Sequence, residues 1–401
     1  MGKTGPEGDS DPRGVEILKI IRLFLTGALL VTGCREQLAD PPLQPSTSAK
    51  APLHLMIPEQ GAYTGAYIDF GETEDDVTLE QIETFEEAVG KRQAIVASSS
   101  YWGEQSFPLH NLEIITRHNA MPLIYWSPWD KPYVMERGPD RFSLDAIVAG
   151  KWDAYIDSWA RQAKSFEGPI FVAWGLEMNG NWFPWSGCFY GGGEQISKGV
   201  YAGPDLYKRA YRHVVDRVRA IGAKNIIWVF HAANYSYPVD QWNQLEEYYP
   251  GDDYVDWLGM SAYGKQFRDD PWVSASDTMI TAYDDLCKLN RNKPVMLAEW
   301  GIAEFPKVGD KAQWITEAFQ IMKTRFPRLK AAVFWSERWE NDDGTYSNLR
   351  VSSSPRALEA YRKGVADSFW LDRPITVDPI RTIGFQAGVK EGGSTELEPT
   401  T

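Results

Sequence analysis

The chain has 401 residues, a formal net charge of −14 at pH 7, and 17 Trp, 19 Tyr and 17 Phe. A chain this acidic repels phosphate backbones and has no cluster of Lys and Arg, which disfavours a nucleic-acid partner. Its 43% hydrophobic residues exclude a disordered chain, and its low mean hydropathy excludes a polytopic membrane protein.

The first element in chain order has the pattern of an export signal. Residues 17–33 (ILKIIRLFLTGALLVTG) form a strongly apolar run with Lys19 and Arg22 near its start. The uninterrupted part, Leu23 to Val31, is short for a membrane span and has the length of a signal-peptide apolar region. Residues 1–33 are therefore predicted to be a signal segment.

The end of this run points to a lipid anchor. Residues 31–34 (VTGC) resemble the lipobox of bacterial lipoproteins, which implies acylation of Cys34 and an exported protein at the cell surface or in the periplasm. Residues 34–58 are Pro- and Ser-rich and are predicted to be a linker. Acidic residues before the apolar run leave two alternatives, an ordinary anchor helix or a start codon assigned too early.

From residue 62 onward, short apolar runs alternate with amphipathic stretches. This alternation predicts a parallel sheet, and eight repeats predict a (β/α)8 TIM barrel, an α/β fold, over residues 59–370. A doubly wound open sheet is the alternative, but the Gly-rich phosphate turn typical of that fold is absent after the first strand. The predicted strands are Ala62 to Ile68, Ala94 to Ser98, Met121 to Trp126, Ile170 to Trp174, Ile226 to Phe230, Trp257 to Ser261, Pro294 to Ala298 and Ala331 to Trp335.

Between these strands, apolar residues at three- and four-residue spacing predict helices. After the barrel, residues 371–401 are predicted to be an extension, which packs on the barrel at first and ends in a disordered tail. Examples of these helical patterns are residues 79–90, 151–166, 205–222, 276–290 and 311–326.

In a barrel of this kind, chemistry belongs at the carboxyl ends of the strands, where the loops meet at one mouth. Glu177 follows the fourth predicted strand and Glu299 follows the seventh. Two carboxyls across a mouth are what glycoside hydrolysis requires: one protonates the departing oxygen and the other attacks or stabilises the anomeric carbon. Such a pair needs separated pKa values, and Tyr263 at the end of the sixth strand is placed to donate to Glu299 and keep it ionised. The alternative is that each Glu is a structural ion-pair partner at the rim.

Several tryptophans are expected to line the same mouth. They lie near strand ends or beside Gly, Pro and Asn, and flat apolar side chains there are typical of a site that stacks a sugar ring. The alternative for any one of them is that it caps the core. The expected lining residues are Trp102, Trp126, Trp182 and Trp335.

Two motifs, EMNGNWFPW at 177–185 and AEWG at 298–301, resemble those of glycoside hydrolase family 26, a family of retaining barrel enzymes that includes β-mannanases, mixed-linkage β-glucanases and β-1,3-xylanases. The resemblance covers roughly residues 60–365. It implies that Glu177 is the acid/base and Glu299 the nucleophile, with Tyr263 hydrogen-bonded to the nucleophile. It also implies that Trp335 forms part of the sugar-binding floor and that Trp182 and Trp102 are substrate platforms.

The resemblance implies a retaining endo-β-glycanase acting on β-1,4-mannan or mixed-linkage β-1,3-1,4-glucan, without a cofactor. Members commonly have His directly before the acid/base, and this chain has Leu176 there. That departure is the one hint of an alternative function, a non-catalytic polysaccharide-binding protein on a hydrolase scaffold. Inverting hydrolysis is a further alternative within the enzyme class. We expect a monomer whose partner is the polysaccharide and which meets the membrane only through its anchor.

The remaining candidates are less specific. His231, past the fifth strand, either contacts a sugar hydroxyl or is a structural imidazole. Cys188 and Cys287 are expected to be free thiols, with a disulfide as the alternative. No metal site is expected, since Cys-x-x-Cys and His-Glu-x-x-His are absent, and the acidic run 71–76 is assigned to turn chemistry rather than calcium. Glu337, beside Trp335, is assigned to solvated loop charge rather than a further subsite.

Overall fold

The computed structural model describes residues 53–133, 138–166 and 168–377. The predicted signal segment, Cys34, most of the predicted linker and the tail from residue 378 lie outside the described residues. Within the described ranges, no helix is long and apolar enough to cross a membrane.

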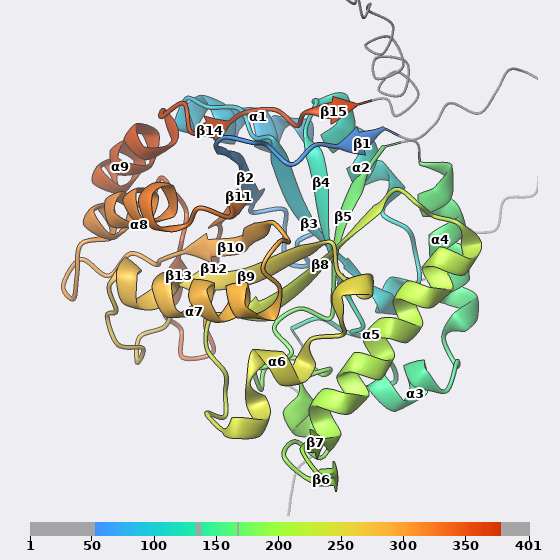
Figure 1. The fold of residues 1–401 in the computed structure, drawn as a ribbon. Coiled ribbons are helices and arrows are strands. Elements are labelled where there is room, and N and C mark those ends of the chain that lie inside the picture. Colours follow the sequence, from blue (N-terminus) through green and yellow to red (C-terminus); the bar gives the residue numbers. More distant parts are fainter. Residues whose placement is uncertain (1–52, 134–137, 167, 378–401) are drawn as a thin grey trace, which may run out of the picture. The chain divides into compact units, whose positions relative to one another are not determined.

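Eight parallel strands close into a barrel surrounded by helices (Figure 1). The last strand pairs with the first, with Ala331 opposite Tyr63, and this pairing closes the sheet. The (β/α)8 prediction is confirmed, and every predicted strand corresponds to one of the eight. The barrel strands are β2 (Ala62–Ile68), β3 (Ile95–Tyr101), β4 (Met121–Ser127), β5 (Ile170–Trp174), β8 (Ile226–Ala233), β9 (Trp257–Tyr263), β10 (Val295–Gly301) and β11 (Leu329–Ser336).

The strands read as continuous apolar runs because both of their faces are covered. Every residue of β2, β3, β4, β5 and β10 is buried, with the barrel interior on one side and the helix layer on the other. Several strands run further toward the mouth than the apolar runs predict. Tyr263 and Glu299 therefore lie within β9 and β10, where the sheet's hydrogen bonds fix their backbones.

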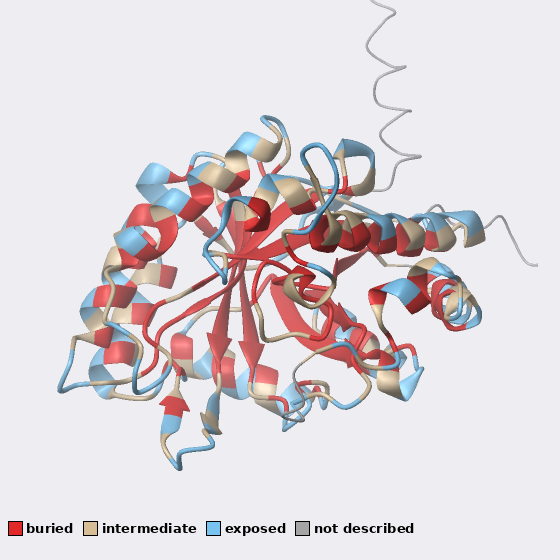
Figure 2. Cartoon of the chain, turned by 90° about the horizontal axis from the view of Figure 1, so that it is seen from below, coloured by how far each residue is buried: buried red, intermediate tan, exposed pale blue. Residues whose placement is uncertain are grey.

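The helices bury the face that lies against the barrel and expose the opposite face (Figure 2). In the first helix, Ile82, Phe85 and Val89 are buried, and each stabilises the fold by about 1.5–3 kcal/mol. Thr78 caps its first turn, and Gly90, with a left-handed φ of 71°, ends it. The helices are α1 (Leu79–Val89), α2 (Leu109–Arg117), α3 (Leu144–Val148), α4 (Asp153–Ser165), α5 (Ala202–Ile221), α6 (Leu245–Tyr248), α7 (Ala275–Leu289), α8 (Lys311–Arg325) and α9 (Pro355–Val365).

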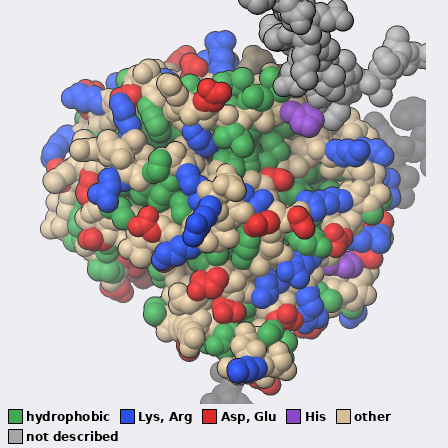
Figure 3. All heavy atoms as spheres, in the orientation of Figure 1, with side chains coloured by type: hydrophobic (Ala, Val, Ile, Leu, Met, Phe, Trp, Pro, Cys, Tyr) green, Lys and Arg blue, Asp and Glu red, His purple; other side chains and the backbone are tan. Residues whose placement is uncertain are grey.

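Short peripheral strands lie near both ends of the described part of the chain. β1 (His54–Leu55), in the segment assigned to the linker, pairs antiparallel with β15 (Thr376–Val377), and β14 (Trp370–Leu371) extends the sheet beside the start of β2. Two loops contain antiparallel hairpins: β6 (Gln195–Ser197) pairs with β7 (Val200–Tyr201), and β12 (Arg338–Glu340) pairs with β13 (Tyr346–Asn348). On the face shown in Figure 3, acidic and basic side chains are interspersed.

Candidate active site

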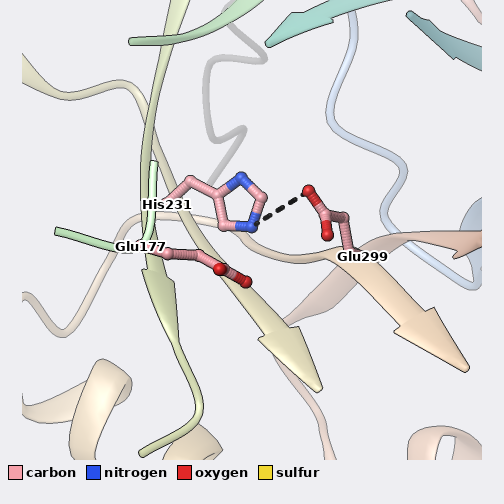
Figure 4. A group of neighbouring side chains, drawn as sticks. All are labelled: Glu177, His231 and Glu299. Carbon is pink, nitrogen blue, oxygen red and sulfur yellow. Dashed lines mark ion pairs between the residues drawn. The ribbon is translucent and has the colours of Figure 1, made fainter. Parts of the chain in front are cut away.

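The two predicted carboxyls meet at the carboxyl ends of the barrel strands (Figure 4). Glu299 lies in β10 and is 6% exposed, and Glu177 follows β5 and is 8% exposed. One carboxylate oxygen of each lies within 4.8 Å of the other. Although they are 122 positions apart in sequence, the barrel brings the two carboxyls close together at one end of its strands.

An unusual backbone conformation aims Glu177 into the mouth. The chain leaves β5 through left-handed conformations at Gly175 (φ 56°) and Glu177 (φ 53°), and the Glu177 amide donates to the carbonyl of His231 in β8 at 2.7 Å. Glycine adopts this conformation freely, but a glutamate in it costs about 1–3 kcal/mol, and such residues concentrate at functional sites. The Trp182 indole then donates to Glu177 Oε2 at 2.6 Å and fixes the carboxyl.

Glu299 is held by donors from the neighbouring strand β9. The Tyr263 hydroxyl donates to Glu299 Oε2 at 2.7 Å, so the predicted hydrogen bond is present. Hydrogen bonding from Ser261 also lowers the pKa of Glu299 and that of Glu177. Sequence reasoning missed Ser261, because a small hydroxyl residue inside an apolar strand carries no recognisable signal.

Burial raises the pKa of both carboxyls above the ordinary glutamate value. The charge of Glu177 raises the pKa of Glu299 further, and the bonds from Tyr263 and Ser261 offset only part of these effects. The sequence argument expected hydrogen bonds to hold the pKa of Glu299 down; in the structure, desolvation is the larger effect. Because two close carboxyls resist double ionisation, the pair retains one proton between its two apparent pKa values. That is the protonation state in which one group can act as an acid and the other as a nucleophile.

His231 is a neutral, buried imidazole. It is 1% exposed, and burial lowers its pKa to about 3. Its Nε2 lies 2.7 Å from Ser261 Oγ and 4.0 Å from Glu299 Oε1, the contact drawn as a dashed line in Figure 4. A neutral ring contributes no counter-charge to Glu299. Its position between Ser261 and Glu299 fits the structural alternative, in which the ring orients the Ser261 hydroxyl.

Glu177, His231 and Glu299 also form the one cluster in the described ranges whose ligand atoms lie close enough to surround a metal ion. Sequence motifs did not predict this cluster. Trp182 donates to one of its carboxyls and Tyr263 to the other, while Ser261 bonds the imidazole. These hydrogen bonds suit a carboxyl pair that exchanges protons.

Trp335, at the end of β11, forms an aromatic floor at the mouth. One face stacks on Tyr67, with ring centroids 3.9 Å apart and planes inclined by 19°. Its indole donates to Glu337 Oε2 at 2.8 Å, and Tyr125 links it to His231, with centroids 5.9 and 5.8 Å from the two rings. Trp335 thus lies on the inner side of the barrel and is linked through Tyr125 to His231, while its role as a sugar-binding floor stays a prediction.

Trp102 and Trp126 do not reach the mouth, and their prediction as lining residues was wrong. Both are 0% exposed. Trp126 stacks on Trp159 of α4 at 4.1 Å and donates to the Tyr155 hydroxyl at 3.0 Å, and Trp102 packs 5.4 Å from Trp126. Successive strand residues point to opposite faces, so Tyr125 enters the barrel while Trp126 faces the helix layer.

Sequence reasoning also missed Glu74, which lies in the acidic run 71–76. Its carboxyl is buried in the mouth and accepts from Ser99 Oγ at 2.7 Å, Tyr101 Oη at 3.3 Å and the Tyr133 hydroxyl. Glu74 and Tyr133 both adopt left-handed φ, 59° and 60°. Burial raises the pKa of Glu74, whose charge in turn raises the pKa of Glu299.

Glu337 completes a set of four carboxyls and is not solvated loop charge. Burial, together with the charge of Glu74, raises the pKa of Glu337 to about 8. The half-buried Glu337 carboxyl also accepts the hydrogen bond from the Trp335 indole. Elsewhere, Cys188 and Cys287 are free, as expected.

Comparisons with known proteins agree with this geometry. The family model of glycosyl hydrolase family 26 matches residues 129–342, which include Glu177, Tyr263, Glu299 and Trp335. Endoglucanase H of Acetivibrio thermocellus is 30% identical over 331 residues, which cover 80% of this chain and 33% of that protein. Beta-1,3-xylanase TXYA of Vibrio sp is 25% identical over 242 residues, covering 55% of this chain and 48% of the relative.

A mannan endo-1,4-beta-mannosidase of Bacillus subtilis is 25% identical over 244 residues, covering 60% of this chain and 58% of the relative. The chain thus spans about a third to somewhat over half the length of these relatives. Among solved structures, Bacillus subtilis mannanase man26 superimposes with a TM-score of 0.55 at 19% identity, covering 78% of this chain and 87% of that chain, which shows the shared fold. Since the family model covers more than half of the sequence, the chain belongs to glycosyl hydrolase family 26.

Proposed function

We propose that this chain is a retaining endo-β-glycanase that hydrolyses β-1,4-mannan or mixed-linkage β-1,3-1,4-glucan. The observation that carries the proposal is the pair Glu177 and Glu299, with carboxylate oxygens within 4.8 Å across one mouth. Retaining glycosidases hold their carboxyls about 5–5.5 Å apart, whereas inverting enzymes need about 6.5–9.5 Å to admit a water between them. The short separation favours double displacement.

In the first step, Glu299 attacks the anomeric carbon while protonated Glu177 gives its proton to the departing oxygen. Burial raises the pKa of both carboxyls, that of Glu299 well above its ordinary value, so the assignment of the two roles rests on the family motifs and not on burial. In the second step, Glu177, now ionised, removes a proton from water, which displaces Glu299 from the sugar. Trp182 and Tyr263 hold the two carboxyls in place through both steps.

Two substitutions test the roles separately. Glu299→Ala removes the nucleophile and Glu177→Ala removes the acid/base, and each should lower turnover of the natural glycan by at least about 10³-fold. With an activated aryl glycoside and added azide, the Glu177 variant should release a β-glycosyl azide, because Glu299 still forms the intermediate. The Glu299 variant should release the α-glycosyl azide, because azide then attacks the substrate directly in place of Glu299. Undiminished activity of the Glu299 variant would refute the assignment.

A glycan panel tests the substrate and the rival function. The relatives named above are an endoglucanase, a β-1,3-xylanase and a mannanase, so the panel contains barley β-glucan, β-1,3-xylan and mannan. Reducing-sugar release is measured beside retention on the same glycans in affinity gels. Release of sugar supports the enzyme. Retention without release would establish the alternative, a binding protein on a hydrolase scaffold.

The proposed location rests on the sequence of the first 34 residues. We propose that the protein is exported and tethered through acylated Cys34, either at the cell surface or in the periplasm. The test is fractionation of a bacterial host that expresses the full chain. Wild-type protein should enter the membrane fraction, and Cys34→Ser should move it to the soluble exported fraction. An unmodified Cys34 in the mature protein would contradict the proposal.

A further inference from the structure

Two exposed tyrosines lie on the Glu177 side of the mouth, on a loop to which the hydrolytic mechanism gives no role. Tyr235 and Tyr237 follow β8 and are 58% and 52% exposed. The ring centroids of Tyr235 and Trp182 are 6.0 Å apart, and Trp182 is the residue that donates to Glu177. Partial burial raises the pKa of Tyr235 and the charge of Glu177 raises it further, so the Tyr235 hydroxyl lies within electrostatic reach of the acid/base.

The backbone of this loop is anchored although its side chains are exposed. Asn179, two residues after the acid/base, is 0% exposed; its Oδ1 accepts from the Ala233 amide at 2.9 Å and its Nδ2 donates to the Tyr235 carbonyl at 3.1 Å. The Tyr237 amide donates to the Asn179 carbonyl at 2.9 Å. Buried Asn243 adds bonds of 2.9 Å to the carbonyls of Asn179 and Pro238. The two tyrosines are therefore fixed relative to the segment that carries Glu177.

The roles of the two carboxyls indicate which part of the glycan this loop contacts. Glu299 attacks the sugar that stays on the enzyme, and Glu177 protonates the oxygen of the part that leaves. Groups gathered around Glu177 therefore meet the leaving part of the chain. Aromatic rings on a fixed backbone suit the apolar faces of sugar rings, and they lose little conformational entropy on binding.

We propose that Tyr235 and Tyr237 extend the Trp182 platform into a binding surface for sugar units on the leaving side of a β-glycan. This inference rests on the proposed function. The surface is aromatic, and the carboxyls of Glu177 and Asp270 lie close enough to Tyr235 to raise its pKa further beyond the effect of burial, so it fits an uncharged chain of sugars better than an anionic one. Because the surface binds sugar units beyond the bond that is cut, it favours cleavage inside a polymer over removal of single terminal sugars.

The same surface holds a sugar acceptor for transfer. In the glycosyl-enzyme, the anomeric carbon is esterified to Glu299. A hydroxyl of a sugar bound on Tyr235 and Tyr237 attacks that carbon, Glu177 takes the hydroxyl proton, and the bond to the Glu299 oxygen breaks as the new glycosidic bond forms. No oxidant or further reactant is required. Transfer to sugars should therefore compete with hydrolysis.

The test compares substrates with and without sugar on the leaving side. The polymer is barley β-glucan or mannan, whichever the wild-type protein cleaves, and the reference is the 2,4-dinitrophenyl trioside of the same series, whose leaving group contains no sugar. The Tyr235→Ala, Tyr237→Ala double variant should lose roughly 5- to 150-fold more kcat/KM on the polymer than on the aryl glycoside. Tyr235→Phe, Tyr237→Phe keeps both rings and should recover most of that loss.

The matched control is Tyr254→Ala, since this partly buried tyrosine precedes β9 and so lies at the opposite end of the barrel. Tyr254→Ala should leave kcat/KM unchanged on both the polymer and the aryl glycoside. With the aryl glycoside as donor and the disaccharide of the same series as acceptor, mass spectrometry should show a lower ratio of transfer to hydrolysis for the double alanine variant. Equal losses on polymer and aryl glycoside, or an unchanged transfer ratio, would overturn the inference. A wild-type protein that cleaves neither substrate would instead refute the proposed function.

Discussion

Replacement of Tyr263 by phenylalanine isolates the hydrogen bond that opposes the burial of Glu299. The Tyr263 hydroxyl donates to Glu299 Oε2 at 2.7 Å, and burial raises its own pKa, so it remains a donor throughout the working pH range. Glu299 must be ionised to attack. The bond favours the ionised carboxyl, so its removal raises the pKa of Glu299 above its already elevated value. The acid limb of kcat/KM should therefore move to higher pH.

The size of this shift follows from the strength of the bond. A hydrogen bond to a charged group contributes about 1.5–3 kcal/mol, and one pKa unit corresponds to about 1.4 kcal/mol. The acid limb should rise by roughly 1–2 pH units, and kcat/KM below the limb should fall roughly 10- to 150-fold. At higher pH, where Glu299 is ionised in both proteins, the loss should be smaller because the phenylalanine ring still fills the site.

The assay is the pH dependence of kcat/KM on an activated aryl β-glycoside, with Tyr125→Phe as the control. Tyr125 is also a buried tyrosine of the mouth, but its hydroxyl donates to the Ala298 carbonyl at 2.8 Å and not to a catalytic carboxyl. The control should leave the acid limb in place. An unshifted limb in Tyr263→Phe, or the same shift in both variants, would show that this bond does not set the ionisation of the nucleophile.

Four further substitutions probe other parts of the mouth and the core. Glu74→Gln removes a charge that raises the pKa of Glu299, so the acid limb should move by up to about one unit to lower pH, opposite to Tyr263→Phe; a move to higher pH would contradict this. Trp126→Ala should destabilise the fold by about 3–5 kcal/mol in denaturant unfolding, whereas Trp182→Ala should mainly reduce activity; the reverse pattern would restore Trp126 as a platform. Glu337, with a pKa of about 8, keeps its proton to higher pH when folded than when unfolded, so it weakens the fold as pH rises from about 4.5 to 8. Glu337→Gln should flatten that decline by up to about 1.4 kcal/mol per pH unit, and an unchanged slope would mean that Glu337 ionises normally.

The barrel could be predicted from the sequence because its strands are buried on both faces. Such strands read as short unbroken apolar runs, and eight of them between amphipathic stretches admit few other folds. Helix α9 was overlooked although its signal is present: Ser354 caps its first turn and Pro355 opens it. Glu177 and Glu299 were predictable because strand ends converge in a barrel and because their motifs are specific.

The direction in which a side chain points was harder to predict than its position along the chain. Trp126 and Trp335 both end apolar runs, yet Trp335 stacks inside the barrel on Tyr67 while Trp126 stacks outside it on Trp159. Successive side chains of a strand point to opposite faces, so this alternation distinguishes the two tryptophans once the register of each strand is known. An unbroken apolar run has residues of one kind on both faces, so its sequence does not reveal the register.

Glu74 shows why the pKa values of the site could not be predicted from the sequence. One glutamate in an acidic run ordinarily lies in solvent, and nothing nearby marks it as different. Its burial depends on hydroxyls from Ser99 and Tyr101 in β3 and from Tyr133 beyond β4, which only the closed barrel brings together. The pKa of Glu299 in turn depends on Glu74, Glu177, Ser261 and Tyr263. The two candidate catalytic glutamates are local features of the sequence, whereas the raised pKa of each is a property of the assembled mouth.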